Sequence, residues 1–215
     1  MESIIEEKVA SFFKKHKHVR LKKGELILKP SESIPYIFYV WKGLIRQYGF
    51  SEDGQEFTLH FFKPGTYFPL MLVLSNEKGT YFFEASSETH VFKAPVDEVL
   101  EFLKHEPEIV FDLACRFSIA LSKMSVRLEN ALSMNSFSKV ASILLYLASR
   151  FGQQINNKLV IKQPFTHHDI STWTGITRET ASRSMEKLKK MGIINYKNRN
   201  IVIKDIQKLQ GLVAS

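Results

Sequence analysis

Four polar side chains near the C-terminus have the types and spacing of a hydrogen-bonding stripe. Arg178, Glu179, Ser182 and Arg183 lie at i, i+1, i+4 and i+5, on one side of a helix. Arginine donates two bonds to guanine O6 and N7, whereas a carboxylate accepts one from cytosine N4. A glutamate beside DNA phosphates would only repel them, so Glu179 indicates contact with bases. The two arginines are expected to hold its carboxylate in position. The alternative is an ordinary acidic residue in a first helical turn.

Two short helices joined by a glycine turn would position this stripe. HHDISTWTG begins after Thr166, and Asp169 completes a capping-box-like pattern. Gly175 ends this helix, Ile176 and Thr177 form the turn, and RETASRSMEKLKKMG is the second helix. This is the helix-turn-helix plan, which presents the start of its second helix to the major groove. Its packed inner face is expected from Ile170, Trp173, Ile176, Ala181, Met185 and Leu188.

The positive charge of the chain is concentrated around these helices. The net charge is +8, yet residues 1–135 hold 17 Lys and Arg against 18 Asp and Glu, and residues 136–215 hold 13 against 4. Clustered cations release counterions when they meet phosphates, so we expect double-stranded DNA as the partner, a solvated basic face being the alternative. INYKNRNIVI predicts a basic hairpin. Phosphate contacts are expected from Thr166, His168, Thr177, Thr180, Lys187, Lys197 and Arg199, with Lys187 otherwise part of a solvated tail.

A long helix is predicted from Glu108 to Asn135, a run without Gly or Pro. It carries an unbroken a/d seam of apolar residues spaced 4, 3, 4, 3, 4, 3. The seam residues are Val110, Ala114, Phe117, Leu121, Met124, Leu128 and Ala131. Such a seam predicts a parallel dimer, although it could instead pack on the preceding domain. Asn135 and Ser136 then predict the cap of a further helix that ends at Gly152.

The first half of the chain has the pattern of an all-β domain. After an amphipathic helix over residues 3–17, short aromatic and β-branched runs alternate with turn signals from residue 20 to residue 95. VDEVLEFLKHEP then predicts a short helix closed by Pro107. The turn spacing is close to that of an antiparallel sandwich or barrel, so the fold class is α+β.

These segments together resemble the CRP/FNR family of bacterial transcription regulators over nearly the full chain. This family resemblance implies the finer form of the fold: an antiparallel β-roll of the jelly-roll type, a long dimerisation helix and a winged helix-turn-helix. The most specific match is R-E-T-x-S-R at residues 178–183. In the family, residues matching Arg178, Glu179 and Arg183, or Glu179, Ser182 and Arg183, read the half-site. The resemblance implies a homodimer on a palindromic operator with TGTGA-like or TTGTGA-like half-sites about one helical turn apart, and RNA polymerase as a further partner. It divides the chain into a cyclic-nucleotide-binding-like effector domain (1–107), a dimerisation helix and hinge (108–135) and a DNA-binding domain (136–215).

The sensing segment departs from the family pattern. Pro69 and Leu70 stand where the family has a Gly-Glu pair for the ribose, and Thr80, Tyr81 and Phe82 stand near its phosphate pair. No arginine lies between Arg46 and Arg116, so a buried phosphate would lack its bidentate partner. We therefore expect no cyclic AMP or cyclic GMP. A cyclic-nucleotide-responsive regulator with an atypical pocket is the alternative.

Other cofactors of the family also lack their residues. The N-terminal cysteines of iron–sulfur members and the Cys and His of haem-binding members are absent, so we expect neither group. A haem- or redox-responsive regulator is the remaining alternative, since His16, His18 or His60 could ligate. His167 and His168 match positions near the DNA backbone. The single cysteine, Cys115, is expected to be a buried, inert thiol beside the seam, a redox switch being the alternative.

An apolar effector pocket is expected from Tyr67, Phe68, Leu70, Met71, Tyr81 and Phe82. It would bind an uncharged effector or a peptide such as glutathione, or be a filled core with constitutive DNA binding. An enzyme is disfavoured because the chain has no P-loop, G-x-S-x-G, H-E-x-x-H or Rossmann fingerprint. We expect a cytoplasmic protein with no membrane partner, because the chain has a single cysteine, no apolar run of about 18 residues and no signal peptide.

Overall fold

A computed structural model describes residues 2–155 and 158–213. Contacts divide the chain into two compact units, Met1–Ala120 and Leu121–Ser215. The division falls inside a helix of 27 residues, α4 (Pro107–Ser133). The predicted seam helix is therefore one continuous helix that contributes to both units, and Pro107 begins it rather than only closing the helix before, as proline at a first helical position can.

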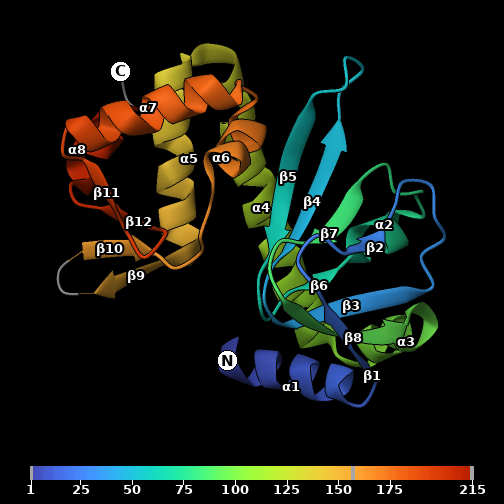
Figure 1. Ribbon diagram of the computed structural model, residues 1–215. Helices are drawn as coiled ribbons and strands as arrows, with labels where there is room; N and C mark the ends of the chain where they lie inside the picture. Colours follow the sequence, from blue (N-terminus) through green and yellow to red (C-terminus); the bar gives the residue numbers. More distant parts are fainter. Residues whose placement is uncertain (1, 156–157, 214–215) are drawn as a thin grey trace. The chain divides into compact units, whose positions relative to one another are not determined.

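The N-terminal unit contains the predicted antiparallel β-roll (Figure 1). Its two four-stranded sheets have the orders β1-β8-β3-β6 and β2-β7-β4-β5. The strands are β1 (Lys17–Leu21), β2 (Leu26–Leu28), β3 (Tyr36–Lys42), β4 (Ile45–Phe50), β5 (Glu56–Phe62), β6 (Tyr67–Phe68), β7 (Phe82–Ala85) and β8 (Thr89–Pro95). The helices of this unit besides α4 are α1 (Glu2–Lys14), α2 (Leu70–Ser75) and α3 (Val96–His105).

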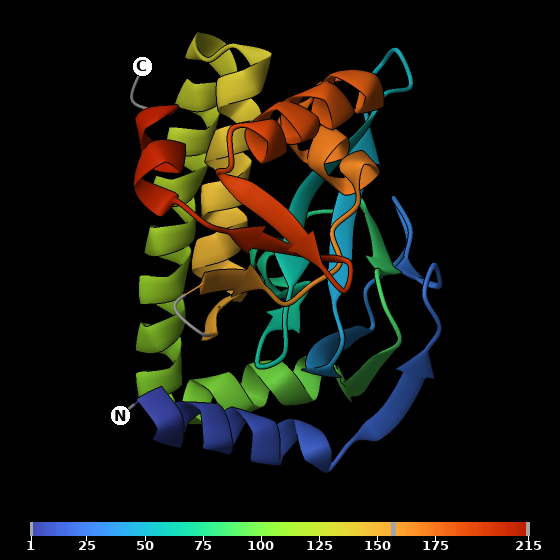
Figure 2. The same cartoon turned by 60° about the vertical axis from the view of Figure 1, so that its left-hand side comes forward.

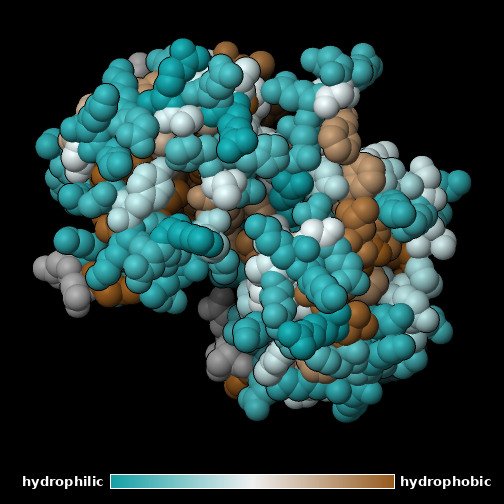
Figure 3. All heavy atoms as spheres, in the orientation of Figure 1, coloured by the Kyte–Doolittle hydropathy of each residue, from teal (hydrophilic) through white to brown (hydrophobic). Residues whose placement is uncertain are grey.

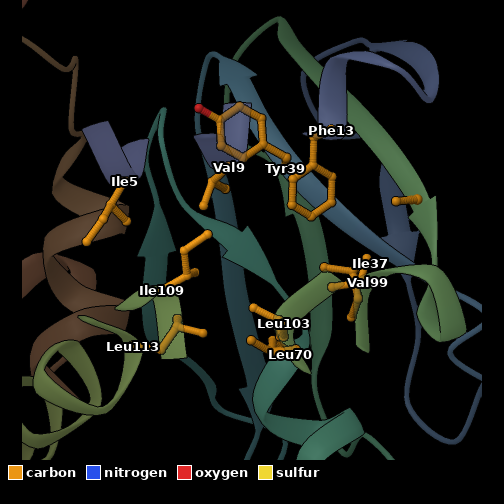
Figure 4. Packing of buried hydrophobic residues seen from close by; sticks show 11 residues of the cluster. Ile5, Val9, Phe13, Ile37, Tyr39, Leu70, Val99, Leu103, Ile109 and Leu113 are labelled. Atoms are coloured by element: carbon orange, nitrogen blue, oxygen red, sulfur yellow. The ribbon is translucent and has the colours of Figure 1, made fainter. Parts of the chain in front are cut away.

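Alternating side chains of β3 separate two cores in this unit. Ile37 and Tyr39 belong to a helix-side core, whereas Phe38 and Val40 belong to a between-sheet core, as the two-residue period of a strand requires. Helices α1, α3 and the start of α4 cover the helix-side core (Figure 4). It contains Ile5, Val9, Phe13, Leu70, Val99, Leu103, Ile109 and Leu113.

The sequence did not indicate α2, which lies within residues 20–95, where an all-β domain was expected. The run LMLVLS is too short for its periodicity to distinguish helix from strand. It forms a single helical stretch after Pro69 and ends at Asn76, whose φ of 53° is left-handed. This helix carries part of the predicted effector segment away from the strands.

The C-terminal unit contains the end of α4, four further helices and a four-stranded antiparallel sheet of order β11-β12-β10-β9 (Figure 2). Its helices are α5 (Ser136–Phe151), α6 (His167–Thr174), α7 (Arg178–Lys190) and α8 (Ile206–Gly211). Its strands are β9 (Gly152–Ile155), β10 (Lys158–Ile161), β11 (Ile194–Lys197) and β12 (Asn200–Ile203). Asn135 caps α5 as predicted, since its side chain accepts from the amides of Phe137 and Ser138. The β9 strand and α8 were not predicted.

None of the helices within residues 2–155 and 158–213 combines the length and the apolar composition needed to cross a membrane.

Candidate nucleic-acid interface

The first helix of the pair, α6, is fixed at its start by a complete capping box. The amide of Asp169 donates to the Thr166 hydroxyl at 3.2 Å, and the amide of Thr166 donates to the Asp169 carboxylate at 2.7 Å. The box satisfies amides that have no partner within the helix. Both residues were predicted for this role from their spacing.

The turn between α6 and α7 depends on Gly175. Its φ of 68° and ψ of 28° are left-handed, a conformation that glycine adopts without a Cβ penalty. The amides of Gly175 and Ile176 both donate to the carbonyl of Ser171, at 3.0 and 3.3 Å. Thr177 then caps α7 by accepting from the Thr180 amide at 3.2 Å. Local hydrogen bonds therefore stabilise the turn between α6 and α7.

The second helix, α7, has two clearly different sides. Ala181, Met185 and Leu188 are fully buried, and Ile170 and Trp173 of α6 are also buried. This confirms most of the predicted inner face. Arg178, Glu179 and Arg183 are exposed, and Ser182 is half-buried. Figure 3 shows mainly hydrophilic side chains over α7. The predicted base-reading stripe is thus one accessible surface at the start of the helix.

The arginines do not hold Glu179 as expected. Among the described residues, no ion pair joins its carboxylate to Arg178 or to Arg183, although pairs three or four residues apart occur elsewhere, such as those of Arg116 with Asp112 and of Lys189 with Glu186. Arg183 instead donates to the Thr180 hydroxyl at 3.5 Å. The Glu179 carboxylate is therefore an exposed acceptor that neither neighbouring cation engages.

The predicted phosphate contacts surround this stripe, and several already have partners. The Thr166 hydroxyl donates to Asp169 at 2.7 Å, the hydroxyls of Thr177 and Thr180 lie 2.9 Å apart, and the Lys187 ammonium lies 4.4 Å from the centroid of the Phe137 ring. His168, Lys197 and Arg199 are exposed. Lys187 therefore lies against α5 while it remains exposed to solvent.

Strands β11 and β12 form a tight hairpin, the wing, which carries two basic residues. Lys197 pairs with Asn200, so Asn198 and Arg199 form a two-residue loop. Both have positive φ, 51° and 65°, as a type I′ turn requires. The predicted Lys-Asn-Arg-Asn turn is thus confirmed, and Arg199 lies at its tip.

The structure gives His167 a contact that the sequence did not indicate. Its Nε2 lies 3.0 Å from the hydroxyl of Tyr196 in β11, so the start of α6 is tied to the wing. Burial raises the pKa of Tyr196 to about 12, and Glu186 adds to this shift. The sequence places His167 near the DNA backbone, and no sequence pattern identifies its partner.

Most of the seam on α4 is exposed in a single chain. Leu121, Met124 and Leu128 are 68%, 59% and 62% exposed, and Val110, Ala114 and Ala131 are also exposed. Phe117 is half-buried and packs against the helix-side core. At this residue the seam therefore packs on the preceding domain, which was the alternative to a dimer contact.

Another side of α4 is also apolar. Phe111, Ile119 and Val126 are exposed there, and so is Cys115, which the sequence predicts to be buried. This second stripe has a spacing of 4, 4 and 7 residues in the sequence, which is less regular than the spacing of the seam.

The six residues predicted to line an effector pocket lie in different packing clusters. Phe68 belongs to the between-sheet core, whereas Leu70 belongs to the helix-side core and Tyr67 packs against it. Met71 is exposed. The ring of Tyr81 meets Phe57 edge-on, and Phe82 stacks on Tyr48. A hollow of about 540 Å³ lies elsewhere, between α1 and α3.

The two arginines that flank the candidate phosphate segment of the β-roll both have carboxylate partners. The Arg46 guanidinium donates to Glu56 at 2.8 Å and lies 4.2 Å from the centroid of the Tyr48 ring. Arg116, the next arginine along the chain, pairs with Asp112 at 2.6 Å. A carboxylate thus engages each of these two guanidinium groups. The family binds the phosphate in the segment around Tyr81, which lies between the two arginines and contains no other arginine.

The candidate haem and metal ligands are dispersed. Within the described part of the chain, no three His, Cys, Asp or Glu side chains are grouped so as to hold a metal ion. The His60 ring packs against Phe62. His18 Nε2 lies 3.1 Å from His90 Nδ1, and His16 lies 4.0 Å from Glu98.

Comparison with known proteins supports both halves of this architecture. A cyclic nucleotide-binding domain model matches residues 18–106, and a Crp-like helix-turn-helix domain model matches residues 138–212. The transcriptional regulator SdrP of Thermus thermophilus is 27% identical over 200 residues, which cover 92% of this chain and 94% of SdrP. The crystal structure of a CRP/FNR-family transcriptional regulator from Thermus thermophilus superposes with a TM-score of 0.71 at 27% identity, covering 93% of this chain and 99% of that one. FixK2 from Bradyrhizobium japonicum shares the fold, with a TM-score of 0.79 at 24% identity over 93% of this chain and 98% of FixK2.

Proposed function

The chain belongs to the CRP/FNR family of transcription regulators, and we propose that it acts as a homodimer that reads a specific DNA sequence. The observation that carries the proposal is the exposed stripe of Arg178, Glu179 and Arg183 at the start of α7, opposite a fully buried face. A basic surface alone would bind any duplex. An exposed carboxylate within it favours a duplex that offers a donor at the matching position.

The proposed operator is palindromic. Arg178, Glu179, Ser182 and Arg183 would read a TGTGA-like or TTGTGA-like half-site, and the exposed seam of α4 would pair two copies. A two-fold dimer then presents two recognition helices to half-sites about one helical turn apart. Thr166, His168, Thr177, Thr180, Lys197 and Arg199 would contact the phosphates and set the register. Lys187 would join them by leaving the ring of Phe137. RNA polymerase is the proposed protein partner.

The proposed regulator responds to an effector other than a canonical cyclic nucleotide, or to none. The engaged side chains of Arg46 and Arg116 support this. The match of residues 18–106 to a cyclic nucleotide-binding domain favours the opposite candidate, a cyclic-nucleotide-responsive regulator. Isothermal titration of the full chain with cyclic AMP and cyclic GMP separates them: no heat supports the proposal, and micromolar binding supports the alternative.

A haem- or redox-responsive regulator is tested on the same preparation. We expect no haem absorption band in the visible spectrum and a native mass equal to two unmodified chains. A Soret band, or extra mass that reduction removes, would establish that alternative.

The DNA-binding proposal is tested with the full chain and labelled duplexes at fixed salt. Fluorescence anisotropy should show about 10³-fold or tighter preference for a duplex with two TGTGA-like half-sites over a scrambled duplex. Equal affinity for the two duplexes would leave a non-specific DNA-binding protein and reject the proposal.

A further inference from the structure

Two side chains from the last turns of α4 contact the helix-turn-helix domain. The guanidinium carbon of Arg127 lies 5.4 Å from the centroid of the Trp173 ring in α6. The amide of Asn130 donates a 2.9 Å hydrogen bond to the Ser142 hydroxyl in α5. Because Arg127 and Asn130 are three residues apart, they share one face of α4. The end of α4, α5 and α6 are therefore joined at two points.

Trp173 offers Arg127 a fixed surface. The indole is buried, and its ring meets the Tyr146 ring of α5 edge-on with 5.2 Å between centroids. A buried aromatic pair shared by two helices moves only if the core around it repacks. The ring of Trp173 therefore gives the Arg127 guanidinium a fixed contact surface on the domain.

Arg127 is an unusual residue for a helix junction. The residue is half-buried, and this burial lowers the pKa of the arginine, while Tyr146 opposes the shift. A cation over an aromatic face is attracted more strongly when it is desolvated, and the planar guanidinium has preferred orientations that a methylene chain lacks. An apolar side chain would fill the space with less dependence on direction.

We propose that Arg127 and Asn130 are positioning residues that hold the recognition helix α7 at one orientation to α4 and thereby set the half-site spacing that the dimer accepts. Helix α7 packs on both α5 and α6, the two helices that Asn130 and Arg127 contact. Rotation of this domain about α4 would move the recognition helices of the two protomers relative to one another. The inference rests on the proposed function, because spacing has meaning only for a dimer on a two-part operator.

The test uses the full-length protein and duplexes in which the distance between two half-sites varies by single base pairs. Arg127→Met keeps the aliphatic stem and removes the charge, whereas Arg127→Lys keeps a cation. Lys123→Met is the matched control, because it removes a charge from an exposed position one turn earlier on α4. Asn130→Ala removes the second contact.

The wild-type protein should prefer one spacing. Arg127→Met should reduce that preference over the adjacent spacings by about two- to thirtyfold, the range found for residues that couple two sites. Arg127→Lys and Asn130→Ala should reduce it less, and Lys123→Met not at all. An unchanged preference in Arg127→Met, or equal weakening at every spacing, overturns the inference and leaves the proposed function intact. Absence of sequence-specific binding by the wild-type protein overturns the proposed function first.

A second measurement needs no DNA. The chain has two tryptophans, so Trp41→Phe leaves Trp173 as the sole indole. In that background Arg127→Met should shift the emission of Trp173 while the far-UV circular dichroism is unchanged, and Lys123→Met should not. Identical emission spectra for the three proteins would show that Arg127 does not contact Trp173 in solution, which also overturns the inference.

Discussion

His167 Nε2 lies 3.0 Å from the hydroxyl of Tyr196, and this contact joins the first turn of α6 to the wing strand β11. Tyr196→Phe removes the hydroxyl and keeps the ring. We expect the free energy of unfolding of the C-terminal unit to fall by about 1 kcal/mol, the usual net value of one hydrogen bond. Urea titration followed by Trp173 fluorescence, in the Trp41→Phe background, measures this. An unchanged midpoint would show that the contact adds nothing to stability.

The same tyrosine predicts a dependence on alkaline pH. Tyr196 has a pKa of about 12 against an ordinary value of 10.0, so the folded state holds the proton more tightly. Its stabilisation is complete below pH 10 and is lost as the pH rises from 10 to 12. Burial also raises the pKa of Tyr67 in the other unit, so the comparison must be between variants. The stability of the C-terminal unit should fall more steeply over this window in the wild-type background than in Tyr196→Phe, and parallel pH profiles would contradict the assignment.

The exposed seam predicts a dimer that one charge can disrupt. Leu121→Glu should give monomers, because it places like charges opposite one another at a position 68% exposed in the single chain. Light scattering measures the mass. Leu121 is a better target than Phe117, which also packs within its own protomer.

Ser122→Glu is the matched control for the dimer. This residue is also exposed, but it lies about 100° around the helix from Leu121. The control should remain dimeric. If Leu121→Glu remains dimeric as well, the interface lies on another surface.

The wing predicts a contribution to affinity that is independent of sequence. Lys197→Ala or Arg199→Ala should weaken binding to every duplex similarly and reduce the slope of log affinity against log salt by about 1. The selected consensus should not change. Lys204→Ala, an exposed lysine just beyond β12, serves as the control. A changed consensus in the Arg199 variant would mean that the wing reads bases.

Local signals made the DNA-reading half predictable. Thr166, Asp169 and Gly175 act through hydrogen bonds and backbone angles within a few residues, so their types and spacing were sufficient. The long helix was equally clear, because a run without Gly or Pro and with a regular seam has few alternatives. The match to the Crp-like helix-turn-helix domain, residues 138–212, includes the DNA-reading segment.

The sensing half was less predictable because its contacts depend on tertiary packing. Phe68 and Leu70 are two residues apart, yet they enter different cores because α2 begins between them. A short apolar run does not show where such a break occurs. The ion pairs expected for Glu179 are also absent among the described residues, because residue spacing alone does not set the direction of a side chain on an exposed helix.

Contacts between distant segments left no trace in the sequence. Arg127 and Trp173, or His167 and Tyr196, meet only because helices cross and a strand returns beside them. Both pairs were visible as residue types but not as partners.

Base reading by α7 is tested most directly by selecting binding sites from random duplexes with wild-type protein, Glu179→Ala and Glu186→Ala. Glu186 gives the same change of charge seven residues further along α7, where its carboxylate lies 3.9 Å from Lys189. Wild type and Glu186→Ala should select the same palindrome with TGTGA-like half-sites. Glu179→Ala should lose discrimination at one base pair in each half-site, by about 1 to 3 kcal/mol. An identical consensus for all three proteins, or no enriched palindrome with the wild type, would contradict the account.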